Sequence, residues 1–255
     1  MVDRGELKEF LDFKADRYNR PDFIENDPIA IPHRYSRKED IEIAGFLIST
    51  ISWGNRKLIV QNGHRMMDHL GNSPYDFVLH HKARDLEKIQ SFVHRTFNGR
   101  DFTFFIKSLK NIYLRHQGLE RIFLSHATPD SLRESIHHFK QYFFELPHEK
   151  RICKHVPDPM EGSAAKRINM YLRWMVRADK SGVDFGIWNR ISPGALSCPL
   201  DLHSGSVARK LGILGRKQND DRAVKELDTS LRILDPDDPV KYDFALFGLG
   251  IFEKF

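Results

Sequence analysis

Cysteines and long hydrophobic runs are scarce in this sequence, and their scarcity excludes whole classes of protein. Only two cysteines, Cys153 and Cys198, occur among 255 residues. A disulfide framework, a four-cysteine iron–sulfur cluster and a four-cysteine zinc site all need more. No apolar run approaches the roughly 20 residues of a membrane span. The opening MVDRGELKEF also lacks the apolar core of a signal peptide. We therefore expect a monomer in the reducing cytoplasm, away from membranes.

Metal-ligand spacing and strand-like alternation are missing as well. The histidine pairs at 80–81 and 137–138 are not spaced as ligands on one helix face, so we expect no metal chemistry. No segment alternates convincingly at period two. Apolar positions recur at helical spacing instead, with breakers between the periodic stretches. We predict an all-α fold, with short helices within 75–90 and longer ones over residues 6–19, 40–51, 56–70, 102–116, 128–143, 162–177, 204–211, 221–234 and 240–250.

The chain is long enough for one large domain or two small ones. We predict a single unit over residues 1–255, made of two helical lobes with a cleft between them. One lobe spans about residues 40–156, and the other combines residues 1–39 with 157–255.

Positive charge is concentrated in one stretch of the chain. Residues 150–217 contain 13 Lys or Arg and 5 Asp or Glu, whereas the whole chain carries a net charge of only +5. A polyanionic partner should therefore contact this stretch. A solvated charged face is the alternative interpretation.

A turn rich in Pro and Gly precedes the helix expected from Gly162. Pro157, Pro159 and Gly162 favour a tight turn. A helix that starts after such a turn presents free N–H groups, which suit a phosphate. Lys166 falls in the first turn of this helix, where the helix dipole and burial disfavour protonation of its amine. A neutral amine is what a lysine nucleophile needs, although a lysine at a helix start is more often a surface residue.

The segment KRINMYL at Lys166–Leu172 resembles the helix after the hairpin in the helix-hairpin-helix (HhH-GPD) DNA glycosylase superfamily. Within that resemblance, the chain is nearest to an uncharacterised bacterial family related to the superfamily. The segment PLDLH around Asp201 resembles the downstream element that carries the superfamily's aspartate. Two further segments are similar to its strand-inserting helix–turn–helix and its last helix, namely residues 48–59 and 239–248.

The resemblance implies a DNA repair glycosylase with AP lyase activity, acting on double-stranded DNA that contains a damaged base in the bacterial nucleoid. Lys166 would be the nucleophile and Asp201 its acidic partner, and 8-oxoguanine is the leading lesion. No cofactor is implied, because the cysteines of the iron–sulfur branch are absent, but hairpin carbonyls near residues 153–156 would hold a structural alkali ion.

The resemblance also implies roles for further residues. DNA contacts would come from Gly162, Ser163, Ala164, Arg167, His203, Arg209 and Lys210. Strand insertion would use Trp53, Asn55 and Arg56, on a turn between two helices. A base pocket would be lined by Trp188, Phe244 and Phe247. We expect Trp174 to lie in the core, because most aromatic residues at helical spacing do.

Two departures from the superfamily pattern leave other functions open. The hairpin usually reads Gly-x-Gly-x-Lys, but Ala164 stands at the second glycine, and alanine disfavours positive φ. Lys166 and Asp201 are also 35 residues apart, a wide spacing that archaeal 8-oxoguanine glycosylases share. Asp201 read alone is an ordinary N-cap. The alternatives are a non-catalytic DNA-binding protein with this fold and a helical module whose basic face meets an acidic protein.

Overall fold

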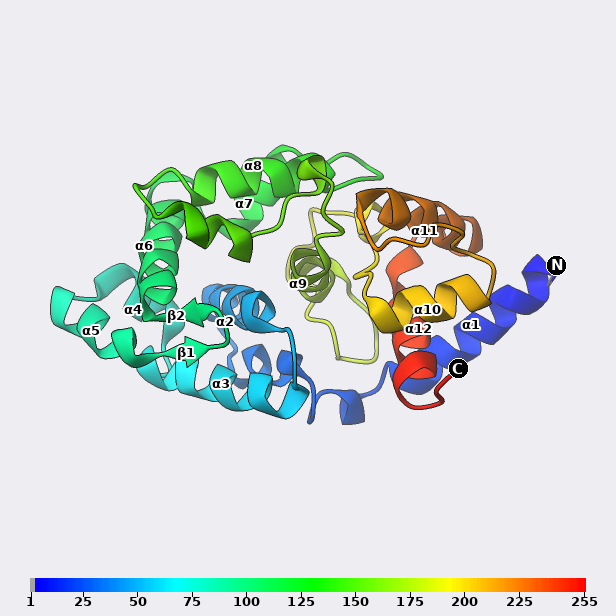
Figure 1. Ribbon diagram of the computed structural model, residues 1–255, viewed down its shortest axis with the longest axis horizontal. Helices are drawn as coiled ribbons and strands as arrows, with labels where there is room; N and C mark the ends of the chain where they lie inside the picture. The colour runs from blue at the N-terminus through cyan, green and yellow to red at the C-terminus, as the bar shows by residue number, and fades with distance from the viewer. Residues whose placement is uncertain (1–2) are drawn as a thin grey trace.

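Helices form nearly all the regular structure of the computed structural model, which describes residues 3–255 (Figure 1). None of these helices is long and apolar enough to cross a membrane. The first half of the chain contains α1 (Arg4–Tyr18), α2 (Lys38–Ile51), α3 (Arg56–His69), α4 (Pro74–His80), α5 (Ala83–Lys88), α6 (Gly99–Arg115) and α7 (Leu119–Ser125). The second half contains α8 (Arg133–Phe143), α9 (Lys166–Val176), α10 (Leu202–Lys210), α11 (Asp221–Leu234) and α12 (Tyr242–Ile251).

The mostly helical prediction is confirmed, with one small exception. Strands β1 (Val93–His94) and β2 (Phe97–Asn98) form an antiparallel hairpin of two residues a side. Each strand is too short to show the alternation that identifies strands in a sequence. Arg95, with φ of 55°, occupies the turn between them.

Several predicted helix starts differ from the structure by two residues or more. In three of them a local polar contact or turn explains the difference. The helix expected from Thr128 begins at Arg133, since Thr128 N–H bonds the carbonyl of Ser131 over 3.0 Å. The helix expected from Gly162 begins at Lys166, after a turn described below. The helix expected from Ser204 begins two residues earlier, because Asp201 caps it.

The helices fall into two groups with α9 between them (Figure 1). On one side α9 packs against α2. On the other, α12 packs against both α1 and α10, so the first and last helices lie side by side.

Buried apolar side chains form two separate clusters. The larger cluster draws on residues 29–196, with Val240 and Phe244. The smaller one draws on α1 and residues 198–249. The predicted division grouped residues 157–196 with the C-terminal helices, whereas their buried side chains, including Trp174, pack in the larger cluster. The reason is that the apolar face of α9 is turned toward α2.

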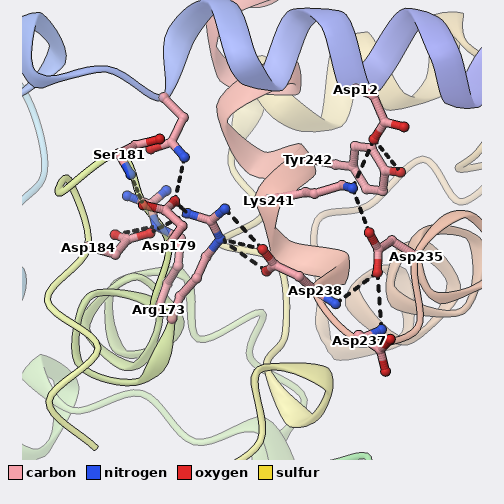
Figure 2. A network of polar contacts seen from close by, with 12 residues as sticks. Asp12, Arg173, Asp179, Ser181, Asp184, Asp235, Asp237, Asp238, Lys241 and Tyr242 are labelled. Carbon is pink, nitrogen blue, oxygen red and sulfur yellow. Dashed lines mark hydrogen bonds and ion pairs between the residues drawn. The ribbon is translucent and has the colours of Figure 1, made fainter. Parts of the chain in front are cut away.

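Buried ion pairs link α9 to the C-terminal segment (Figure 2). Arg173 bonds Asp243, and its Nε lies 3.2 Å from Asp184. Arg177 lies one turn later and bonds both carboxylate oxygens of Asp238 over 3.0 Å. Because buried charges are costly without partners, these contacts fix the position of α9 relative to α12.

Candidate functional site

A cavity of about 780 Å³ lies among α3, α9, α10, α12 and the segment before α2. Its wall combines apolar rings with charged groups. Eight of the residues singled out from the sequence contribute to it: Trp53, Arg56, Lys166, Arg167, Asp201, His203, Phe244 and Phe247. Residues from distant parts of the chain therefore meet around one space of the size that small-molecule sites have.

Lys166 and Asp201 approach each other across this cavity. Lys166 is the first residue of α9, and Asp201 is the N-cap of α10. Lys166 Nζ lies 3.7 Å from Asp201 Oδ2, and both side chains are partly exposed. The two groups are thus within reach of each other directly or through one water molecule.

The two carboxylate oxygens of Asp201 have different partners. Oδ1 accepts hydrogen bonds from the backbone N–H groups of His203 and Ser204, at 2.9 and 3.0 Å. Oδ2 faces Lys166. Asp201 is therefore an N-cap and an acid facing the lysine at once, so the two interpretations of this residue do not exclude each other.

The turn before α9 differs from the expected hairpin at one position. Gly162 is left-handed, with φ of 88°. The second left-handed residue is Ala165, with φ of 48°, and not Ala164, where we expected distortion. Ala165 N–H bonds Ser163 Oγ over 3.1 Å, and the carbonyl of Ala164 accepts a hydrogen bond from Asn169 over 3.2 Å. These contacts fix a conformation that alanine adopts only at a cost.

The turn contacts α11 and lies outside the cavity. The carbonyl of Gly162 accepts a hydrogen bond from the N–H of Asp221 over 3.1 Å. A second hollow, of about 360 Å³, is lined here by Gly162 together with Arg133, Arg222 and Lys225. Sequence reasoning missed Arg222 and Lys225, because α11 lies beyond the basic stretch.

Of the residues predicted to insert between strands, two line the cavity and one does not. Trp53 is partly buried, with its ring 4.8 Å from the Arg167 guanidinium and 5.2 Å from His94. Arg56 lies over the ring of Phe247 at 4.8 Å. Asn55 is exposed and caps α3 by accepting a hydrogen bond from Leu58 N–H over 3.1 Å.

Of the three predicted base-pocket residues, the structure brings Phe244 and Phe247 to the cavity but not Trp188. Trp188 is fully buried in the larger core, where its Nε1 donates to Glu42 Oε1 over 2.6 Å. A buried indole N–H needs an acceptor, and the acceptor on α2 draws Trp188 away from the cavity. Phe23, which we did not predict, packs edge-to-face on Phe244 and Phe247.

Of the three cationic residues predicted to contact DNA, one lies in the cavity wall and two lie outside it. Arg167 lines the cavity and donates to the carbonyl of Thr50. Burial lowers the pKa of Arg167 to about 10, and no carboxylate within the described chain pairs with it. Arg209 is occupied elsewhere, because it bonds Arg216 O over 2.8 Å and Asn219 Oδ1 over 2.5 Å. Lys210 is exposed.

Two buried aspartates in the cavity wall were not predicted. Burial raises the pKa of Asp243 to about 6, against the attraction of Arg173. Burial also raises the pKa of Asp27, against the attraction of Arg56. In the sequence, Asp27 precedes a proline, which is the pattern of a helix cap. That pattern is local and does not indicate that the residue lines a cavity.

The backbone near the turn does not suit the expected alkali ion. Residues 150–155 form a 3₁₀-helix, and the carbonyl of Cys153 accepts a hydrogen bond from Val156. Arg167 Nη2 lies 3.5 Å from the carbonyl of Lys154. A guanidinium so close to a would-be ligand repels a cation, so the residues present do not fit this group.

Comparison with known proteins adds a family. The chain belongs to the family described as "Protein of unknown function (DUF2400)". The DUF2400 model matches residues 27–252, a range that includes Lys166, Asp201 and every other cavity residue except Phe23. No curated protein and no solved structure matches the chain.

Proposed function

We propose that this protein is a DNA glycosylase of the helix-hairpin-helix class with AP lyase activity, acting on double-stranded DNA with a damaged base. One observation carries the proposal: Lys166 Nζ and Asp201 Oδ2 lie 3.7 Å apart in a cavity walled by aromatic rings. The resemblance to that superfamily, and an architecture of two lobes about the cleft, are parts of the same proposal. The cavity takes Ile59 from the larger apolar cluster, and part of its wall comes from α10 and α12, the helices that carry much of the smaller cluster; this arrangement supports the proposal.

The cavity has the volume and chemistry to accept an extruded nucleotide. A base must leave the duplex before an enzyme can reach its glycosidic bond. Phe23 and Phe247 offer partly exposed rings for stacking, and Arg56 and Arg167 supply positive charge at the same wall. The leading substrate is 8-oxoguanine, on the strength of the resemblance.

Lys166 and Asp201 would carry out the covalent chemistry. Asp201 Oδ2 accepts a proton from the amine, and the neutral Lys166 Nζ then attacks C1′ of the sugar. The C1′–N bond to the base breaks, and the base leaves with the electron pair. The base takes up the proton that Asp201 received, so Asp201 is ionised again as positive charge develops on the sugar. The ring oxygen then releases C1′, giving an imine. Loss of a C2′ proton expels the 3′ phosphate and nicks the strand.

Ionised Asp201 also lowers the barrier electrostatically. Positive charge develops on the sugar as the base departs, and a fixed carboxylate close to it stabilises that charge. The capping bonds of Oδ1 hold the carboxylate in place, so no reorganisation is required during the reaction.

Surface contacts with DNA would come from two regions that flank the cavity. The turn at Gly54 and Asn55, held by Trp53 and Arg56, would enter the duplex. The hairpin turn, with Lys210 on α10 and Arg222 on α11, would meet the phosphates. Arg209 is not among these contacts, because its guanidinium holds the loop that follows α10.

Borohydride trapping tests the proposal directly. Reduction of the imine leaves a permanent protein–DNA adduct, which we expect on lesion and abasic duplexes with wild-type protein. Lys166→Gln should abolish the adduct, whereas Lys154→Gln, at an exposed lysine, should retain it. Equal trapping by Lys166→Gln and wild type would place the nucleophile elsewhere.

A non-catalytic DNA-binding protein with this fold is the second candidate. The capping role of Asp201 favours it, since that role alone explains an aspartate at this position. Salt-dependent DNA binding without any trapped adduct would identify this function. A protein-interaction module would show neither salt-dependent DNA binding nor a trapped adduct.

A further inference from the structure

Asp27 is a buried residue that turns one carboxylate oxygen, without a hydrogen-bond donor from the described chain, toward the cavity. The residue is 7% exposed and lines the cavity. Its Oδ1 accepts a hydrogen bond from the N–H of Ile29 over 3.1 Å. Its Oδ2 accepts none from any residue in the range 3–255. A carboxylate in so buried a position is stable only when it is hydrogen-bonded, so this oxygen needs a donor from within the cavity, and a bound ligand can supply one.

Arg56 lies beside that free oxygen without bonding it. Its Nη2 is 3.9 Å from Asp27 Oδ2, which is too long for a hydrogen bond. The guanidinium stacks on Phe247, and this contact holds it at the cavity wall. One acceptor and one set of donors therefore stand side by side next to an aromatic ring, both with unused hydrogen-bonding capacity.

The other two carboxylates in the cavity differ from Asp27 in their contacts and exposure. Asp201 uses one oxygen to cap α10 and turns the other to Lys166. Asp243 bonds Arg173 with Oδ2, while its Oδ1 lies 3.8 Å from Cys198 Sγ. Asp201 Oδ2 also accepts no hydrogen bond within the described chain, but the Asp201 side chain is partly exposed. Asp27 is thus the buried carboxylate in this wall with an oxygen left for a ligand.

We propose that Asp27 and Arg56 read the edge of the extruded base and select a lactam edge, in which C=O stands beside N–H. The inference rests on the proposed function and adds its substrate class: purines with the guanine-type edge. Arg56 donates to the carbonyl oxygen, and Asp27 Oδ2 accepts from the adjacent ring N–H. An adenine-type edge sets an amino group against Arg56 and a ring nitrogen lone pair against the carboxylate, so both contacts become repulsive.

Two lesions separate base reading from chemistry. 8-Oxoguanine and 8-oxoadenine share the oxidised five-membered ring and differ at the edge, while an abasic duplex offers no edge at all. Trapping rates on each lesion, divided by the rate on the abasic duplex, report base recognition and base release without the later imine steps. A change in the ratio of the two lesions between wild type and a variant then reports base reading. We expect wild-type protein to prefer 8-oxoguanine by about tenfold or more, as two good hydrogen bonds to a base allow.

Asp27→Asn is the decisive variant. The asparagine oxygen keeps the cap on Ile29 N–H, because Asn caps as well as Asp. The amide nitrogen then faces the cavity and presents a donor where the carboxylate presented an acceptor. The preference for 8-oxoguanine should fall by about tenfold or more. Asp22→Asn, an exposed aspartate in the same segment, is the matched control and should retain the preference.

Arg56→Met tests the same pair without altering the buried carboxylate, and should also lower the preference. One outcome would overturn this inference and leave the proposed function standing. In that outcome, wild-type protein traps both lesions and abasic DNA, and Asp27→Asn and Arg56→Met keep the wild-type ratio of the two lesions. A wild type that traps neither lesion nor abasic DNA would overturn both.

Discussion

Trp188 Nε1 donates a hydrogen bond to Glu42 Oε1 over 2.6 Å, across 146 residues of chain. The other oxygen, Oε2, accepts a hydrogen bond from the hydroxyl of Tyr113 over 2.5 Å. Burial raises the pKa of Glu42 to about 7, even though both hydrogen bonds favour its charged form. A polar cluster inside the larger core thus joins α2, α6 and the segment after α9.

The free energy of unfolding should depend on pH through Glu42. The folded pKa of about 7 exceeds the ordinary value of 4.5, so the folded state binds the proton more tightly. The contribution of Glu42 to the free energy of unfolding is fully present below pH 4.5 and is lost as the pH rises through 7. The loss amounts to about 3 kcal/mol. Glu42→Gln should remove this loss in urea unfolding at pH 5 and pH 8, whereas Glu39→Gln on the same helix should not. Parallel pH dependence in wild type and Glu42→Gln would contradict the prediction.

Asp201→Asn should separate the two roles of Asp201. The free energy of unfolding should change by less than about 0.5 kcal/mol, because Asn caps a helix as well as Asp. Single-turnover excision should slow by about 10²–10³, since the charge beside the sugar is lost. Asp3→Asn alters a similar cap on α1 and should leave excision unchanged. An Asp201→Asn variant as fast as wild type would remove Asp201 from the mechanism.

DNA binding should weaken when charge is reversed on α10 and α11. Lys210→Glu and Arg222→Glu alter exposed cations on α10 and α11. In fluorescence anisotropy titrations, each lost phosphate contact should reduce the slope of log affinity against log salt by about 0.9. Arg84→Glu, an exposed arginine on α5, is the control and should keep the wild-type slope. Affinity that is indifferent to salt would favour a protein partner instead.

Arg177→Met should destabilise the fold strongly. Arg177 is buried and pairs with Asp179, Asp184 and Asp238, so its removal leaves those carboxylates without their shared cation. We expect the free energy of unfolding in urea to fall by about 3–5 kcal/mol. Arg121→Met, at an exposed arginine, should cost less than about 0.5 kcal/mol. A small loss for Arg177→Met would mean that water replaces the guanidinium.

The sequence predicted most helices because their apolar periodicity and breakers are local signals. α11 begins and ends where predicted, since Asp220 caps it and Asp235-Pro236 follows it. The start of α8 was wrong because Thr128 and Ser131 close a turn that looks like a helix cap in sequence. Periodicity within α9 predicted a buried face but did not indicate which core would receive it.

The proximity of Lys166 and Asp201 could be predicted, because each residue stands at a helix start inside a recognisable segment. Trp188 could not be placed, because its position depends on Glu42, an acidic residue in an otherwise apolar helix. Asp27 escaped notice for a similar reason. Its partners across the cavity come from α3 and α12, and only the folded chain brings them together.

The contact between α1 and α12 also affects how the chain folds during synthesis. Leu7 and Leu11 of α1 are buried against the smaller core, which includes Leu246 and Leu249 of α12. A ribosome adds about 5–20 residues per second, so α1 emerges on the order of ten seconds or more before α12. Its apolar face stays exposed to chaperones and to other nascent chains throughout that interval. Slowing translation of the segment between α1 and α12 should therefore increase aggregation.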